Sequence, residues 1–152
     1  MSQRKDEIRV LVENRRVRHE YVLEETWEAG IALVGSEVKS LRAGQGNLAE
    51  AWVRIAPDGA WLMQCHIAPY AQANRQNHEP VRPRRLLLHD HELNKLWKAT
   101  KQGGMTVVPV RLYLKGSLIK IEIALARGKK LHDKRESIKE RDAKREMARS
   151  RR

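Results

Sequence analysis

The sequence predicts a mainly β protein on three observations. Residues 51–67 alternate between apolar and polar side chains on both sides of the turn at 57–59, as a β-hairpin requires. Residues 118–126 carry branched apolar side chains at alternate positions, and only 86–102 has the spacing of a longer helix. We therefore expect a small antiparallel barrel of the OB type with roughly six short strands, a short helix and a central helix; a flat α+β sandwich is the alternative.

The N-terminal third combines a charged arm, extended structure and the short helix. Residues 1–13 are charged and are expected to form a flexible arm, while 17–24 and 30–34 are expected to be extended. Ser36 is a favourable N-cap for a helix over 37–42. Four tryptophans stand in a chain without phenylalanine, and at least two of them are expected in the core.

The second half continues from the hairpin into a long loop, the central helix and two strands. The loop over 68–85 is rich in Pro, Asn, Gln and Arg, and a loop of that length is more often functional than idle. Asp90 can cap the central helix. A strand over 106–114 contains Pro109, which favours an edge position because proline cannot donate to a sheet. The barrel is expected to span 14–127.

The remaining residues, 128–152, form a basic tail. They hold eleven Lys or Arg and five Asp or Glu, which is half of the chain's formal net charge of +12. Apolar residues are too few and too irregularly spaced to form a stripe that could pack on a core. We expect the tail to be disordered when free, to be capable of forming a helix, and to bind a polyanion.

Overall composition supports a nucleic-acid partner. The pI is about 10.3, and a basic protein without such a partner is the alternative. No apolar run approaches the roughly 20 residues of a membrane span, and no secretion signal is recognisable, so we expect no membrane partner. The single Cys65 excludes an internal disulfide and suits the cytoplasm; we expect it to be a buried, inert thiol.

Signatures of catalysis are absent from the sequence. There is no phosphate-binding glycine loop of the common types and no nucleophile-elbow motif. The cluster at 89–91 contains two histidines and an aspartate but no further ligand at a compatible spacing, so polar residues at a helix start are the preferred interpretation. We expect no enzyme, no metal and no cofactor.

Basic residues interleaved with aromatic residues are the stronger signal. Guanidinium groups can bridge phosphates, and a His or Tyr can stack on an unpaired base. A solvated strand with a basic rim is the alternative. The side chains concerned near the N-terminus are Asn14, Arg15, Arg16, His19 and Tyr21, and residues 82–85 form a similar basic turn.

Taken together, these segments resemble the SsrA-binding protein (small protein B) family, the bacterial partner of transfer-messenger RNA (tmRNA) in trans-translation. The resemblance covers about residues 14–145. The matching runs are 14–16 with 20–21, 28–30, 35–42, 84–88, 124–130 and 132–135.

The resemblance implies a fold and a function. It implies an OB-type barrel that binds the tRNA-like domain of tmRNA and enters ribosomes stalled on messages without a stop codon. The tail would lie as a helix in the vacant mRNA channel near the decoding centre, against small-subunit rRNA. Elongation factor Tu would be an indirect partner through the charged tmRNA. The protein would be a cytoplasmic adaptor without bond chemistry.

The resemblance also implies which residues contact RNA. Glu28 can accept hydrogen bonds from base edges or ribose hydroxyls, although a salt bridge to a nearby arginine is the alternative. The family often has Asn where this chain has His89. The residues expected to bind tmRNA are Asn14, Arg15, Arg16, His19, Tyr21, Glu28, Lys39, Arg42, Leu87 and His89.

A second set belongs to the tail. His132 could stack on an rRNA base. The residues expected at the decoding centre and mRNA channel are Gly128, Lys129, Lys130, His132, Asp133, Lys134, Arg135, Lys139 and Arg141. A rival function on the same barrel is a general RNA chaperone or a ribosome-assembly factor.

Overall fold

The computed structural model describes residues 7–72 and 77–129, together with Arg141 and Arg145. Its strands are β1 (Ile8–Glu13), β2 (Tyr21–Ile31), β3 (Gly46–Asn47), β4 (Trp52–Ala56), β5 (Gly59–Met63), β6 (His66–Ile67), β7 (Arg84–Leu87), β8 (Thr106–Lys115) and β9 (Leu118–Gly128). The helices are α1 (Val17–Glu20), α2 (Gly35–Arg42) and α3 (Asp90–Lys101).

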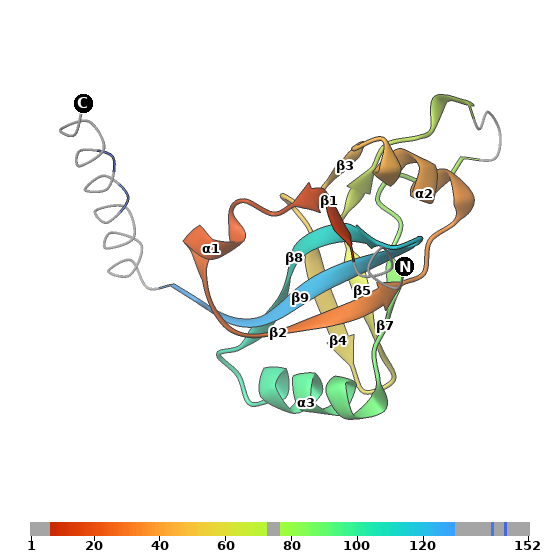
Figure 1. The fold of residues 1–152 in the computed structure, drawn as a ribbon. Coiled ribbons are helices and arrows are strands. Elements are labelled where there is room, and N and C mark those ends of the chain that lie inside the picture. Colours follow the sequence, from red (N-terminus) through yellow and green to blue (C-terminus); the bar gives the residue numbers. More distant parts are fainter. Residues whose placement is uncertain (1–6, 73–76, 130–140, 142–144, 146–152) are drawn as a thin grey trace.

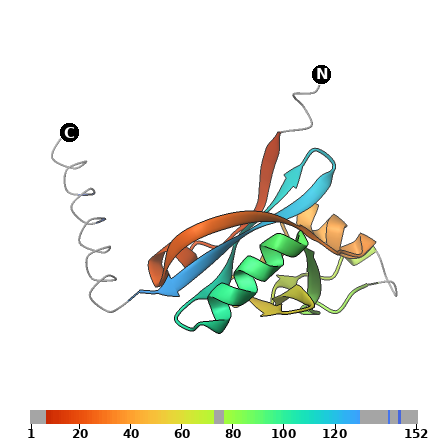
Figure 2. The same ribbon diagram turned by 90° about the horizontal axis from the view of Figure 1, so that it is seen from below.

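The predicted mainly β, OB-type fold is confirmed. Seven antiparallel strands pair in the order β1-β8-β9-β2-β7-β5-β4, and the sheet curves so that β4 comes into contact with β8 (Figure 1). A second small sheet pairs β3 with β6. The helix α3 lies across one end of the strands (Figure 2). In the part of the chain that the structure describes, no helix has the length and apolarity needed to cross a membrane.

Alternation along the strands separates a core face from an outer face. On β9, Ile121 and Ile123 are fully buried, whereas Lys120 and Glu122 point away from the core. Leu96 of α3 is also fully buried and closes the core at the end of the barrel. The expectation of two core tryptophans is wrong, since all four retain exposed surface and the core is filled by aliphatic side chains instead.

Part of the predicted N-terminal arm is a strand. Residues Ile8–Glu13 form β1, which pairs with β8, so the flexible-arm expectation fails for this stretch. The β-branched residues of β1 favour a strand, and pairing with β8 supplies its backbone hydrogen bonds, so the strand forms despite the charged residues in it. The predicted extended segment 17–24 is also partly wrong, because Val17–Glu20 is a helical turn. Val17 is buried against valines of β8 and alanines of β9 on the outer face.

Both longer helices begin elsewhere than predicted. In α2, the predicted cap Ser36 instead shares a hydrogen bond of 2.8 Å with His78 Nδ1, and the Val34 N–H donates to Glu37 Oε1. In α3, the N-cap is His89 rather than Asp90. The helix cannot start at residue 86 because β7 occupies that stretch, paired with β2 and β5.

The strand that holds Pro109 is not an edge strand as predicted, although Pro109 itself pairs with β9 only, because the pairing with β1 ends at Arg111. The strand β8 lies inside the sheet, between β1 and β9, and its register shifts between Pro109 and Arg111. A β-bulge at this point tolerates the missing N–H of proline.

A buried ionic network joins α2 to the basic turn at 82–85. Arg84 and Glu37 are both fully buried, and Arg84 Nε donates to Glu37 Oε2 at 2.5 Å. Arg82 donates to the other carboxylate oxygen, and Arg84 also donates to the Cys65 carbonyl at 2.6 Å. Burial alone would raise the pKa of Glu37, but these hydrogen bonds outweigh burial and lower it. Arg84 is therefore a structural residue, not an RNA ligand.

Candidate nucleic-acid interface

Glu28 lies on the outer face of the sheet, held by two neighbours. The Tyr113 hydroxyl of β8 donates to Glu28 Oε2, and Lys115 Nζ lies 3.3 Å from Oε1. The side chain of Glu28 remains 38% exposed, so carboxylate lone pairs still face solvent. The alternative of a structural salt bridge is correct in kind, but the cation is Lys115 rather than an arginine.

These contacts fix the protonation states at the site. The hydrogen bond from Tyr113, assisted by Lys115 and Lys120, holds the pKa of Glu28 below its ordinary value. Burial, followed by the bond to Glu28, raises the pKa of Tyr113. At neutral pH, Glu28 is therefore an ionised acceptor in a fixed orientation, and Tyr113 is a neutral donor.

Leu87 shares this outer face with Glu28. It is 57% exposed and pairs across the sheet with Gly30, two residues beyond Glu28 on β2. A Cβ atom on Gly30 would lie 3.1 Å from Leu87 Cβ, so the glycine allows the leucine to lie close over the strand. The structure thus brings the two residues into one surface, an exposed apolar contact beside an oriented carboxylate.

His89 follows Leu87 at the start of α3. Its N–H donates to Glu92 Oε1 at 3.0 Å, and its exposed ring stacks on His91 with centroids 5.7 Å apart. Within the described residues, no three His, Cys, Asp or Glu side chains gather as a metal site would need. His89 therefore presents an exposed ring two residues beyond Leu87.

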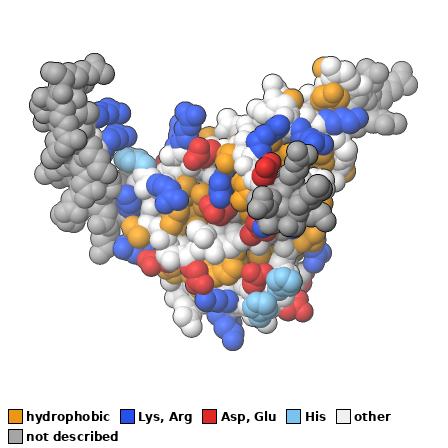
Figure 3. Space-filling view, in the orientation of Figure 1, with side chains coloured by type: hydrophobic (Ala, Val, Ile, Leu, Met, Phe, Trp, Pro, Cys, Tyr) orange, Lys and Arg blue, Asp and Glu red, His pale blue; other side chains and the backbone are white. Residues whose placement is uncertain are grey.

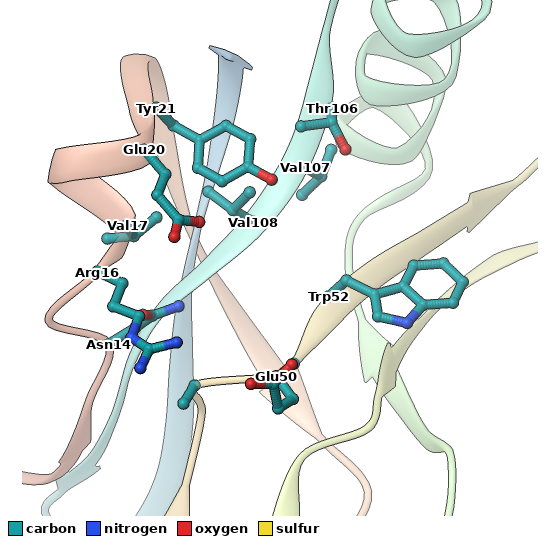
Figure 4. A pocket seen from close by; sticks show the side chains of 12 residues that line it. Asn14, Arg16, Val17, Glu20, Tyr21, Glu50, Trp52, Thr106, Val107 and Val108 are labelled. Atoms are coloured by element: carbon teal, nitrogen blue, oxygen red, sulfur yellow. The ribbon is translucent and has the colours of Figure 1, made fainter. Parts of the chain in front are cut away.

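The basic segment before α1 borders a pocket of about 230 Å³. Figure 4 shows Arg16, from this segment, and Tyr21, at the start of β2, on one side of the hollow, with Glu50 and Trp52 on the other side. Asn14 is anchored, because its side-chain amide donates to the Pro109 carbonyl at 3.0 Å. The anchor holds the arginines that follow it against the end of β8.

A second hollow, of about 430 Å³, connects the same segment to the outer face. Arg15 and Arg18 line one side of it, and Arg111 and Glu122 line the other. His19 is exposed on α1. The basic segment and the sheet surface are therefore continuous.

Lys39 and Arg42 belong to a separate basic group on α2. Lys39 Nζ lies 5.7 Å from the centre of the Tyr70 ring, and the Arg42 carbonyl accepts a hydrogen bond from Arg9 of β1 at 2.9 Å. Figure 3 shows basic side chains near α1 and near α2, with acidic side chains between them over the strands. Among the described residues on this face, the α2 group and the α1 group therefore form separate patches.

The structure describes only some of the predicted tail residues. Gly128 ends β9, and the Lys129 N–H donates to the Glu20 carbonyl at 2.9 Å, so the chain leaves the barrel beside α1. Arg141 has an exposed side chain. The other predicted tail residues lie outside the described part of the chain: Lys130, His132, Asp133, Lys134, Arg135 and Lys139.

Sequence reasoning missed the partners of Glu28. Tyr113 and Lys115 are 85 and 87 residues away from Glu28. Alternation alone would assign both to one face of β8, but the register between strands was needed to bring them to Glu28.

Comparisons with known proteins agree with this geometry. The model of the SmpB protein family matches residues 11–152. The SsrA-binding protein of Symbiobacterium thermophilum is 53% identical over 152 residues, covering 99% of this chain and 96% of that protein. The SsrA-binding protein of Roseiflexus sp. is 53% identical over 151 residues, with the same coverage of 99% and 96%.

A solved structure gives the same result. A chain described by the words "tmRNA-SmpB: a journey to the center of the bacterial ribosome" has a TM-score of 0.66 and 46% identity, covering 78% of this chain and 84% of its own length. The resemblance found in the sequence is therefore confirmed. With a family match that runs through the barrel from β1 onward, this chain belongs to the SmpB protein family.

Proposed function

We propose that this protein is a cytoplasmic, non-enzymatic RNA-binding adaptor that binds the tRNA-like domain of tmRNA and delivers it to stalled ribosomes for trans-translation. The observation that carries the proposal is the near-full-length similarity to proteins named for binding SsrA RNA. The solved structure named for tmRNA, SmpB and the ribosome supports the same partners.

The oriented carboxylate of Glu28 is the proposed specificity element. An ionised carboxylate that Tyr113 already orients can accept hydrogen bonds from base edges or ribose 2′-hydroxyls without further ordering. Leu87 offers an exposed apolar contact for a base or ribose, and His89 presents an exposed ring two residues beyond it.

Cations supply the affinity in this proposal. Arg15 and Arg16 supply positive charge from the α1 side, His19 or Tyr21 can stack on an unpaired base, and Asn14 anchors the segment to β8. Lys39 and Arg42 would contact a more distant part of the RNA, because α2 carries a separate basic group.

In this proposal the barrel, 14–127, binds tmRNA, and the tail, 128–152, binds the decoding centre and the mRNA channel. The tail's charge favours an RNA-walled channel, where counterion release offsets an ordering cost of about 1–2 kcal/mol per residue. Truncation after Lys129 keeps β9 and its bond to Glu20 intact. The truncated protein should bind tmRNA with nearly wild-type affinity and fail to support peptide tagging; persistent tagging would contradict the tail's role.

Glu28→Gln tests the site directly. A hydrogen bond to a charged group contributes about 1.5–3 kcal/mol, so we expect tmRNA affinity to fall by at least about tenfold in filter binding. Glu24→Gln is the matched control, because Glu24 is also an exposed β2 carboxylate and pairs with Arg127 at 3.1 Å. Equal affinity of the two variants, at equal melting temperature, would refute the role of Glu28.

A general RNA chaperone is the alternative function, and specificity separates the two. The adaptor prefers tmRNA over tRNA and unstructured RNA in competition at two salt concentrations, whereas a chaperone binds all three similarly.

A further inference from the structure

We propose that Arg54, Trp61 and Arg85, here called the arginine row, form a binding site for the phosphodiester backbone of RNA. The row lies outside the Glu28 surface and outside the basic segment near α1. It deepens the proposed function, on which it rests, by adding a positioned phosphate contact to the barrel.

The row is built by strand register. Arg54 of β4 pairs with Trp61 of β5, and Trp61 pairs with Arg85 of β7. The guanidinium carbons of the two arginines lie 5.5 Å and 5.8 Å from the Trp61 ring centroid. Two cations therefore share one aromatic ring, and the cation–π attraction restrains both guanidinium groups.

Alternation directs the row outward. The residues next to it in sequence, Val53, Leu62 and Leu86, are buried, whereas both arginines are exposed. Trp61 is half-buried, and a Cβ atom on Gly59 would lie 3.0 Å from its ring, so the glycine leaves the space that the indole occupies. The ring is fixed to the sheet, and the arginines are ordered by it.

Neither arginine of the row forms a salt bridge within the described residues, although Asp58 and Asp90 line the same pocket as Arg85. Arg54 has no carboxylate within salt-bridge distance there, and Arg85 donates only to the Asp58 carbonyl, at 3.4 Å. By contrast, Arg111 and Arg127 are paired with glutamates. Two guanidinium groups that are ordered by one ring and lie outside salt bridges match the geometry and the charge of phosphate oxygens.

The position of the row favours RNA over a free anion. Arg85 is two residues before Leu87 on the same strand and face, and Leu87 pairs with Gly30 beside Glu28. One strand of RNA that presents a base or ribose to Glu28 can continue its backbone towards Arg85. Phosphate contacts of this kind position the RNA on the protein, whereas hydrogen bonds from bases or riboses to Glu28 provide specificity.

The salt dependence of tmRNA binding tests the proposal. Each phosphate contact contributes about 0.7–0.9 to the slope of log K against log salt concentration. We therefore expect Arg54→Gln and Arg85→Gln each to reduce the slope by that amount, and the double variant by about twice as much. Lys98→Gln on α3 is the control, an exposed cation that is not part of the row, and its slope should equal that of the wild type.

Trp61 has its own readout as a positioning residue. Trp61→Leu retains both charges but frees the arginines, so tmRNA affinity should fall about threefold while the slope stays close to that of the wild type. Trp61→Phe should recover part of the loss because a phenyl ring still offers a face to the cations. Melting temperatures check that the variants are folded. If Trp61→Leu does not fold, the two arginine variants still test the proposal.

Three outcomes would overturn the proposal. If Glu28→Gln weakens tmRNA binding but the arginine variants keep the wild-type slope, the row does not bind phosphate, although the proposed function stands. If the arginine variants lose binding of polyglutamate but not of RNA, the row serves an acidic protein. If the wild type does not prefer tmRNA over tRNA, the proposed function fails. If, in addition, the arginine variants keep the wild-type salt slope on both RNAs, the row does not bind phosphate either.

Discussion

Replacing Glu37 with glutamine would leave a buried positive charge without its partner. Both Glu37 and Arg84 have no exposed side-chain surface, and they meet at 2.5 Å. Arg82 bonds the second oxygen of the same carboxylate. Glutamine keeps the volume of the side chain but cannot neutralise the Arg84 guanidinium, which remains tied to the Cys65 carbonyl inside the protein.

The magnitude follows from burial. Breaking a buried pair by removing one partner costs about 3–5 kcal/mol, whereas an exposed pair contributes about 0–1 kcal/mol. Domains of this size are stable by about 5–15 kcal/mol, so Glu37→Gln should remove roughly a third of the free energy of unfolding. Glu24→Gln, which breaks the exposed pair with Arg127, is the control.

Urea unfolding followed by circular dichroism measures the effect. With a slope of about 1–3 kcal/mol per molar urea, the midpoint of Glu37→Gln should fall by about 2 M, and that of Glu24→Gln by less than about 0.5 M. The double variant Glu37→Gln/Arg84→Met should be more stable than Glu37→Gln alone, because it removes the unpaired charge. Equal midpoints for the two single glutamine variants would refute the reasoning.

Three further predictions concern protonation and packing. Because the folded pKa of Tyr113 is raised by burial and by Glu28, the wild type should lose stability as pH rises above about 10, and Tyr113→Phe should not show this loss in urea midpoints measured up to pH 11. Burial raises the pKa of Cys65 to about 11, so a thiol-specific reagent should label it at neutral pH only in urea; rapid native labelling would contradict its burial. Gly46→Ala would place a Cβ atom 2.8 Å from Leu41 Cδ2 and should cost about 1–3 kcal/mol, seen as a lower melting temperature, whereas an unchanged value would show that the contact relaxes freely.

The sequence predicted those features that neighbours in the chain encode. Period-2 alternation predicted the hairpin of β4 and β5 and the long strand β9, and helical spacing predicted α3. The runs shared with one family predicted membership, which is confirmed, and through it an RNA-binding role for Glu28 and Leu87, which stays a prediction. It misjudged residues 8–13, which pair with β8, and residues 17–20, which form a helical turn whose Val17 packs on β8 and β9.

The amino-acid sequence alone determined the fold class, the family and the charged character of the chain, because periodicity, motif and net charge are local or additive properties. Only the tertiary structure decided which polar side chains are structural and which remain available to RNA. Arg84 meets Glu37 across 47 residues, and Tyr113 meets Glu28 across 85. Strand register fixes such pairings, and register depends on contacts between distant segments that no local pattern contains.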